Sequence, residues 1–169
     1  FFFFPDKTFF SFFRLDTSSG VFGVSISSGV LGLTVSNRGA VTEARLESLS
    51  KVYGVDIVTS ETTKRNATNN IWQELDKVRV KGKEQAVSIF WPMAPVEKLP
   101  KDQSEELRTW AATLKAYRAQ DWDQCDVQLL NLQRQNGKKY LYGLYSERVA
   151  SMRALPFDPG WDGATNFET

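Results

Sequence analysis

Residues Trp72–Trp91 read WQELDKVRVKGKEQAVSIFW, two runs rich in apolar residues on either side of the charged stretch KGKE. β-Branched and aromatic residues recur in both runs, as is typical of strands that bury one face. Gly82, within the charged stretch, can take the positive φ that a tight turn needs. The pattern therefore predicts a hairpin in which strands Trp72–Val80 and Gln85–Trp91 are joined across Lys81–Glu84.

Before the hairpin, apolar residues are spaced first as in a strand, then as in a helix, and then again as in a strand. Val21–Val35 (VFGVSISSGVLGLTV) predicts strand structure with turns at Gly29 and Gly32. Ala40–Tyr53 has the apolar spacing of an amphipathic helix, which Gly54 would end. Val55–Ser60 (VDIVTS) then predicts a short buried strand, whose final serine caps a brief helix. Together with the hairpin, these elements predict an α+β fold with one layer of helices on one sheet.

Three prolines punctuate the stretch PMAPVEKLP after the hairpin and give it the stiffness of a linker. The sequence beyond it has helical spacing. We expect an α+β domain over residues 1–92, a linker over 93–103 and a helical extension over 104–169.

The extension divides into three predicted helices and a tail. The helices cover about residues 104–120, 122–137 and 139–154, and Asp121 caps the second of them. The tail, PFDPGWDGATNFET, predicts a coil anchored by Trp161 and Phe167. A single helical pair cannot bury both of its faces, so we expect the helices to pack on the α+β part.

Composition excludes several chemistries. The 169 residues include no histidine and one cysteine, Cys125, which excludes Ser-His-Asp and Cys-His nucleophilic sites, His-ligated or Cys-rich zinc sites, iron–sulfur clusters and intramolecular disulfides. A net charge of +1 gives no global field that favours nucleic acid. No run approaches the roughly 18 apolar residues of a membrane helix. We expect a cytoplasmic domain, linked to a membrane only through segments absent from this chain.

Two long blocks carry a family resemblance. ARLESLSKVYGVDIVTSETTK (Ala44–Lys64), followed by Trp72–Trp91, resembles the C-terminal half of a class III nucleotidyl cyclase domain. GVSISSGVLG (Gly23–Gly32) fits the strand that precedes it in that family. The stretch from AYRAQDW to PFDPGWDG resembles the C-terminal extension of bacterial adenylate cyclases that carry an extracellular sensor. The resemblance implies a partial ferredoxin-like cyclase sandwich followed by a small tetratricopeptide-like helical tail.

The resemblance also implies a signalling reaction. The ribose 3′-hydroxyl of ATP attacks the α-phosphate and yields cyclic AMP and pyrophosphate, at the interface with a second cyclase domain, most simply in a homodimer. Two ions, Mg²⁺ or Mn²⁺, assist. By resemblance, Arg45 stabilises charge on the transferring phosphate and Lys81 contacts the terminal phosphates. Thr34 stands where the family places a purine-selecting residue.

Each of these residues also has a plainer interpretation. Arg45 shares a helical face with Val41 and Leu49, and an arginine on an apolar stripe needs a partner, which could be solvent or a nearby carboxylate as well as a phosphate. Lys81 could be an ordinary exposed turn lysine. Thr34 could be a strand threonine that faces solvent.

The chain departs from the family pattern at two points. The asparagine expected four residues before Arg45 is replaced by Val41, or by Thr42 if the alignment contains a one-residue gap. The two metal-binding aspartates are not reproduced, because Asp6 and Asp16 lack the expected Lys-x-x-Gly-Asp context. Three hypotheses remain. The chain could be a fragment of a cyclase whose metal ligands come from other segments, a catalytically inactive dimerisation or regulatory module, or a helical interaction tail on an unrelated α+β domain.

Overall fold

The computed structural model describes residues 22–27, 30–35, 49–80, 84–95 and 100–167. Within them lie a two-stranded and a four-stranded sheet, and the larger has the strand order β3-β5-β4-β6. Its strands are β3 (Thr59–Ser60), β4 (Asn70–Val80), β5 (Val87–Pro95) and β6 (Thr165–Phe167). Strands β3, β5 and β4 pair antiparallel, whereas β6 lies parallel to β4. The predicted α+β class is confirmed.

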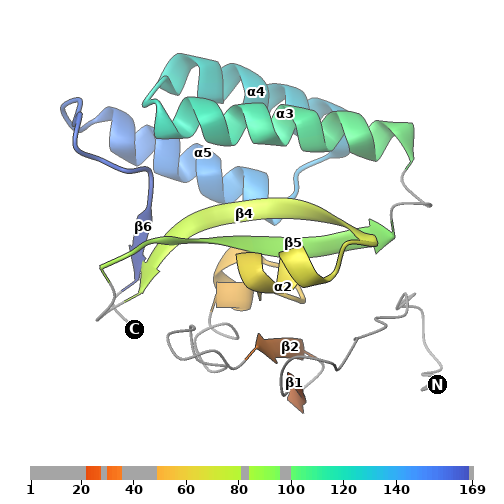
Figure 1. Ribbon diagram of the computed structural model, residues 1–169. Coiled ribbons are helices and arrows are strands. Elements are labelled where there is room, and N and C mark those ends of the chain that lie inside the picture. The colour runs from red at the N-terminus through yellow and green to blue at the C-terminus, as the bar shows by residue number, and fades with distance from the viewer. Residues whose placement is uncertain (1–21, 28–29, 36–48, 81–83, 96–99, 168–169) are drawn as a thin grey trace.

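Helices cover both faces of this sheet. Figure 1 shows α3, α4 and α5 together on one side and α2 on the other. The helices are α2 (Glu61–Asn66), α3 (Lys101–Arg118), α4 (Trp122–Asn136) and α5 (Tyr140–Arg153), and residues 49–53 are also helical. Helices α3, α4 and α5, the helical residues 49–53 and strands β4, β5 and β6 share one apolar core, so the expectation that the extension packs on the α+β part is confirmed. None of the described helices combines the length and apolarity needed to cross a membrane.

The first hairpin differs from its prediction in one respect. Strands β1 (Phe22–Ser27) and β2 (Val30–Val35) pair antiparallel. Gly32 lies inside β2 opposite Ser25, so the turn predicted at Gly32 is wrong. A glycine within a strand is compatible with continued pairing, although it weakens the strand.

The antiparallel strand pair predicted for the second hairpin is confirmed, although β5 begins at Val87 and extends further than expected. Lys81 and Gly82 of the predicted turn lie outside the described residues. Strand β5 continues through Pro92 and Pro95. Proline lacks the N–H that a two-sided strand needs. Among the described residues, strand β3 pairs with Ile89 and Phe90 alone, so the prolines lie where β5 has one described partner strand.

A bulge in β4 organises the packing of the helices. Glu74 lies opposite Phe90 and Asp76 lies opposite Ile89, which makes Leu75 the extra residue. A bulge disrupts the ladder locally and frees backbone groups for other partners. The Trp110 indole donates to the carbonyl of Glu74 at 2.5 Å, and the Tyr145 hydroxyl donates to the carbonyl of Leu75 at 2.9 Å. Hydrogen bonds therefore connect both α3 and α5 to the bulge.

Aromatic side chains fill the space between these helices and the tail. Tyr117 lies edge-on to Tyr145 at a centroid distance of 5.1 Å and to Trp161 at 5.2 Å. Phe167 also packs against the core, which confirms both predicted anchors. The tail is not coil throughout, however, because residues 165–167 form β6. A three-residue strand is too short to leave a periodic pattern in the sequence.

Gly54 follows the helical residues 49–53 and has a left-handed backbone conformation that a substitution can test. Its φ is +63°, and a Cβ there would lie 2.5 Å from Cδ1 of Tyr140. We predict that Gly54→Ala lowers the free energy of unfolding by about 1–2 kcal/mol, because an L-residue is strained in this conformation. Urea denaturation followed by circular dichroism measures the change.

The matched control is Gly143→Ala within α5, where nothing lies within 4 Å of the added carbon. It should raise stability by about 0.5–1 kcal/mol, because alanine favours a helix interior. Equal effects of the two substitutions would contradict the assignment of Gly54 to a left-handed turn.

Candidate functional site

The structure describes the side chain of none of the three residues selected from the sequence. Arg45 and Lys81 lie outside the described residues. Thr34 lies in β2 opposite Gly23, and its side chain is also outside the description. Their predicted functions therefore stay predictions. The structure describes residues 49–80 and 84–95, which are the described segments nearest to Arg45 and Lys81 in the sequence.

A buried carboxylate lies where β4, α5, β6 and the helical residues 49–53 meet. Asp76, in β4, is 1% exposed. Its Oδ2 accepts hydrogen bonds from the Tyr53 hydroxyl at 2.5 Å, from Nη1 of Arg148 at 2.7 Å and from the Thr165 hydroxyl at 2.7 Å. Its Oδ1 accepts from the backbone N–H of Lys77 at 2.7 Å. Both carboxylate oxygens are thus engaged.

We call Asp76, Tyr53, Arg148 and Thr165 the Asp76 cluster. Its four members come from β4, the helical residues 49–53, α5 and β6. Arg148 also donates from Nη2 to the Tyr53 hydroxyl at 3.3 Å, and its guanidinium lies 5.3 Å from the centre of the Tyr53 ring. A buried ion pair needs such additional hydrogen bonds to offset the desolvation of its charges.

The electrostatics of the cluster follow from burial and from this pairing. Burial, followed by the negative charge of Asp76, raises the pKa of Tyr53 well above its usual range. The pKa of Arg148 is raised although burial alone would lower it, because Tyr53 and Asp76 stabilise the guanidinium. Tyr53 therefore stays protonated and Arg148 stays charged at any physiological pH.

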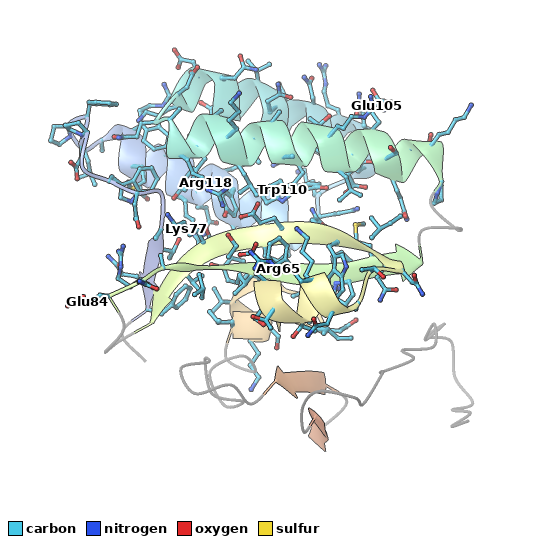
Figure 2. All side chains as sticks on the ribbon, in the orientation of Figure 1. Arg65, Lys77, Glu84, Glu105, Trp110 and Arg118 are labelled. Carbon is cyan, nitrogen blue, oxygen red and sulfur yellow. The ribbon has the colours of Figure 1, made fainter. Side chains whose placement is uncertain are left out.

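Two further carboxylates, Glu106 and Glu74, are also paired with cations. Glu106 in α3 is 3% exposed and accepts from the Tyr142 hydroxyl and the Lys139 ammonium group. Oε1 of Glu74 accepts from Arg118 at 2.7 Å and from the Ser88 hydroxyl at 3.0 Å. Figure 2 shows Arg118 and Trp110 between α3 and the sheet.

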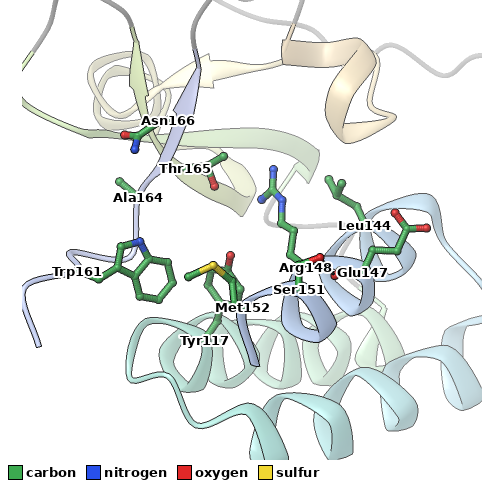
Figure 3. A pocket seen from close by; sticks show the side chains of 10 residues that line it. All are labelled: Tyr117, Leu144, Glu147, Arg148, Ser151, Met152, Trp161, Ala164, Thr165 and Asn166. Atoms are coloured by element: carbon green, nitrogen blue, oxygen red, sulfur yellow. Dashed lines mark hydrogen bonds between the residues drawn. The ribbon is translucent and has the colours of Figure 1, made fainter. Parts of the chain in front are cut away.

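A pocket of about 460 Å³ opens beside the Asp76 cluster, between α5 and the tail. In Figure 3, Trp161 and Met152 lie on one side of it, and Arg148 reaches from α5 toward Thr165. Tyr117 and Leu144 add apolar surface, so the pocket combines an apolar wall with a guanidinium already bound by Asp76. This arrangement offers no free cation to a phosphate group.

Three of the described carboxylates, Asp76, Glu106 and Glu74, are poor candidates for Mg²⁺ or Mn²⁺ ligands because each is paired with a cation. Magnesium needs carboxylate oxygens that remain open to the ion. Asp76, Glu106 and Glu74 instead each face an arginine or lysine. Across the described ranges, no three acidic or cysteine side chains lie close enough together to hold a metal ion.

Sequence reasoning missed the Asp76 cluster. The available sign was an aspartate inside a strand, directly after Leu75, but charged residues also recur on the exposed face of β4. The bulge turns Asp76 inward, and its partners lie 23, 72 and 89 residues away along the chain. A linear pattern cannot connect residues at such separations.

Comparisons with protein-family models, with curated proteins and with solved structures return no match for this chain. A functional conclusion therefore depends on the sequence blocks and on the geometry described above.

The Asp76–Arg148 pair yields a stability prediction. Arg148→Met should lower the free energy of unfolding by about 3–5 kcal/mol, because it leaves a buried carboxylate without its counter-ion. The double variant Asp76→Asn/Arg148→Met should lose less than the sum of the two single losses. Urea denaturation of all four proteins gives the coupling energy, and strictly additive losses would contradict the pairing.

Cys125 yields a chemical prediction. Burial, aided by Asp121 and Asp126, raises the pKa of its thiol to about 12. Because only the thiolate reacts, iodoacetamide at pH 8 should modify the folded chain at least about 100-fold more slowly than the urea-unfolded chain. Mass spectrometry over time measures both rates, and rapid labelling of the folded chain would contradict the buried position.

Proposed function

We propose that this chain is part of a nucleotidyl cyclase that converts ATP to 3′,5′-cyclic AMP and pyrophosphate. The observation that carries the proposal is the order of elements over residues 49–95: a helix, strand β3, the short helix α2 and the hairpin β4–β5. This order coincides with the two sequence blocks that resemble the cyclase family. The turn of the hairpin is where those blocks place Lys81.

The finer fold assignment belongs to the same proposal. The mixed sheet with α2 on one face would be the C-terminal half of a cyclase sandwich. Helices α3 and α4, joined by a short connection at Gln120 and Asp121, would be the tetratricopeptide-like pair. A cytoplasmic position, as part of a bacterial signal-transduction protein, follows from this assignment.

The chemistry requires positioning and charge stabilisation more than proton transfer. The 3′-oxygen bonds to the α-phosphorus while the bond to the pyrophosphate oxygen breaks, and pyrophosphate leaves with the electron pair. Arg45 would stabilise the charge that develops on the transferring phosphate. Lys81 would bind the terminal phosphates, and Thr34 would contact the base.

The rest of the catalytic machinery must come from elsewhere. Because Asp76, Glu106 and Glu74 are each paired with an arginine or a lysine, we assign these three carboxylates no metal ion and no step of the reaction. A second cyclase domain, with its own half of the site, would complete the interface.

A catalytically inactive dimerisation or regulatory module is the alternative. One observation favours it. Asp76, the most deeply buried described carboxylate, binds Arg148 within the protein core. Such a module could still bind ATP, so turnover rather than binding separates the two functions.

The decisive assay measures cyclic AMP formed from ATP with Mg²⁺ or Mn²⁺. We expect little or no product from the chain alone, and turnover when a cyclase domain that supplies the metal-binding carboxylates is added. In that mixture, Arg45→Ala should lower kcat by about 10²-fold or more and change KM less, because it removes an interaction made in the transition state.

The matched control is Arg65→Ala. Arg65 is an exposed arginine of α2 that pairs only with Glu61 among the contacts described, so its loss should leave kcat unchanged. Equal kcat values for wild type and Arg45→Ala would remove Arg45 from the mechanism. ATP binding without turnover in the mixture would favour the inactive module.

A further inference from the structure

The outer face of α4 carries exposed apolar side chains. Figure 1 shows α4 on the outside of the helical layer, with α3 and α5 between it and the sheet. The inner face of α4, with Cys125, Leu129 and Leu132, belongs to the apolar core. On the opposite face, Val127 and Leu130 are 53% and 55% exposed. The helix therefore presents apolar surface to solvent in addition to the face that it buries.

Charged residues continue this surface in both directions. Asp123 lies four residues before Val127. Leu130 follows Val127 by three residues, and Arg134 follows Leu130 by four. This spacing keeps all four positions on one face of the helix. The Asp123 side chain is 90% exposed, and Arg134 is exposed as well. We call Asp123, Val127, Leu130 and Arg134 the α4 stripe, which is acidic at one end, apolar in the middle and basic at the other end.

The two ends of α4 carry opposite charges. At the N-terminal end, the carboxylates of Asp121, Asp123 and Asp126 are accompanied by one arginine. This is Arg153, which binds Asp123 at 2.6 Å and Asp126 at 2.5 Å. The N-terminal end therefore keeps a negative charge. Arg134, in the last turn, has no hydrogen bond or ion pair with any other residue that the structure describes.

The α4 stripe is complementary to itself when one copy is turned by 180°. In an antiparallel pair of α4 helices, with a two-fold axis between positions 128 and 129, Val127 of each copy faces Leu130 of the other. In the same register, Asp123 of each copy faces Arg134 of the other. A parallel pair would instead place acid against acid and base against base, which is destabilising. Charge therefore selects the orientation, and the apolar residues select the register.

We infer that the α4 stripe is a two-fold contact between two copies of this chain. The inference uses α4 alone and does not rest on the proposed function. One helix face from each copy buries less than the roughly 800 Å² per partner of a stable interface. We therefore expect a weak dimer, with a Kd on the order of 100 µM. A contact of this strength becomes effective where copies are concentrated or are already held together.

The first test measures self-association of the full chain by sedimentation equilibrium without nucleotide, from about 10 µM to about 1 mM. We expect Leu130→Glu to raise the dimer Kd at least about tenfold, because it removes apolar surface from both halves of a two-fold contact. The matched control is Phe157→Glu. Phe157 is 70% exposed but lies in the tail, outside α4, so this substitution should leave the Kd unchanged. Circular dichroism should show the same helix content in all three proteins.

Charge reversal tests the register. Asp123→Lys and Arg134→Glu should each raise the homodimer Kd about tenfold, because each substitution places like charges at both ends of the contact. An equimolar mixture of the two variants should associate with nearly the wild-type Kd, since opposite charges then face each other at both ends. Weakening in each variant and recovery in the mixture together require Asp123 of one copy to face Arg134 of the other.

Four results would overturn the inference. The first is a wild-type chain that stays monomeric at about 1 mM. The second is a wild-type Kd in Leu130→Glu, and the third is an equal loss of association in Phe157→Glu. The fourth is a mixture of the two charge variants that associates no more tightly than either variant alone. A dimer that survives every α4 substitution uses another surface, in which case this inference fails while the proposed function stands.

Discussion

The ion pair between Asp76 and Arg148 is the constraint on which the rest of this structure depends. A carboxylate that is 1% exposed is tolerated only with a full set of donors, and its donors come from three other segments of the chain. None of these segments can shift without leaving a buried charge unmatched. The pair therefore defines how α5, β6 and the helical residues 49–53 meet β4.

The bulge at Leu75 constrains the backbone at the same place as this ion pair. It places Asp76 on the inner side of β4, and it also offers two consecutive carbonyl groups to Trp110 and Tyr145. In most sheets such carbonyls would bond to the next strand. Here they bond to aromatic side chains of α3 and α5, so an irregularity in one strand determines where the helical layer lies.

The local elements could be predicted from the sequence far better than their tertiary partners. The hairpin, the serine cap of α2 and the three later helices follow from period, turn residues and capping, which act over a few residues. The pairing of β6 with β4 does not, because three residues carry no period and their partner is distant. The same holds for the Asp76 cluster, because Asp76 and Arg148 lie 72 residues apart and no local pattern marks them as partners. The functions predicted for Arg45, Lys81 and Thr34 still depend on the family resemblance alone, because the structure describes none of their side chains.

The parallel pairing of β6 has a consequence for biosynthesis. Strand β4 and its neighbour β5 can form as soon as their hairpin leaves the ribosome, but the edge of β4 at residues 78–80 has no β6 partner until residues 165–167 have been translated. Contacts across so long a stretch of chain form late and slowly. During that delay an uncovered strand edge can recruit other chains, so the nascent protein passes through an interval in which it is prone to aggregate and is a natural client for chaperones.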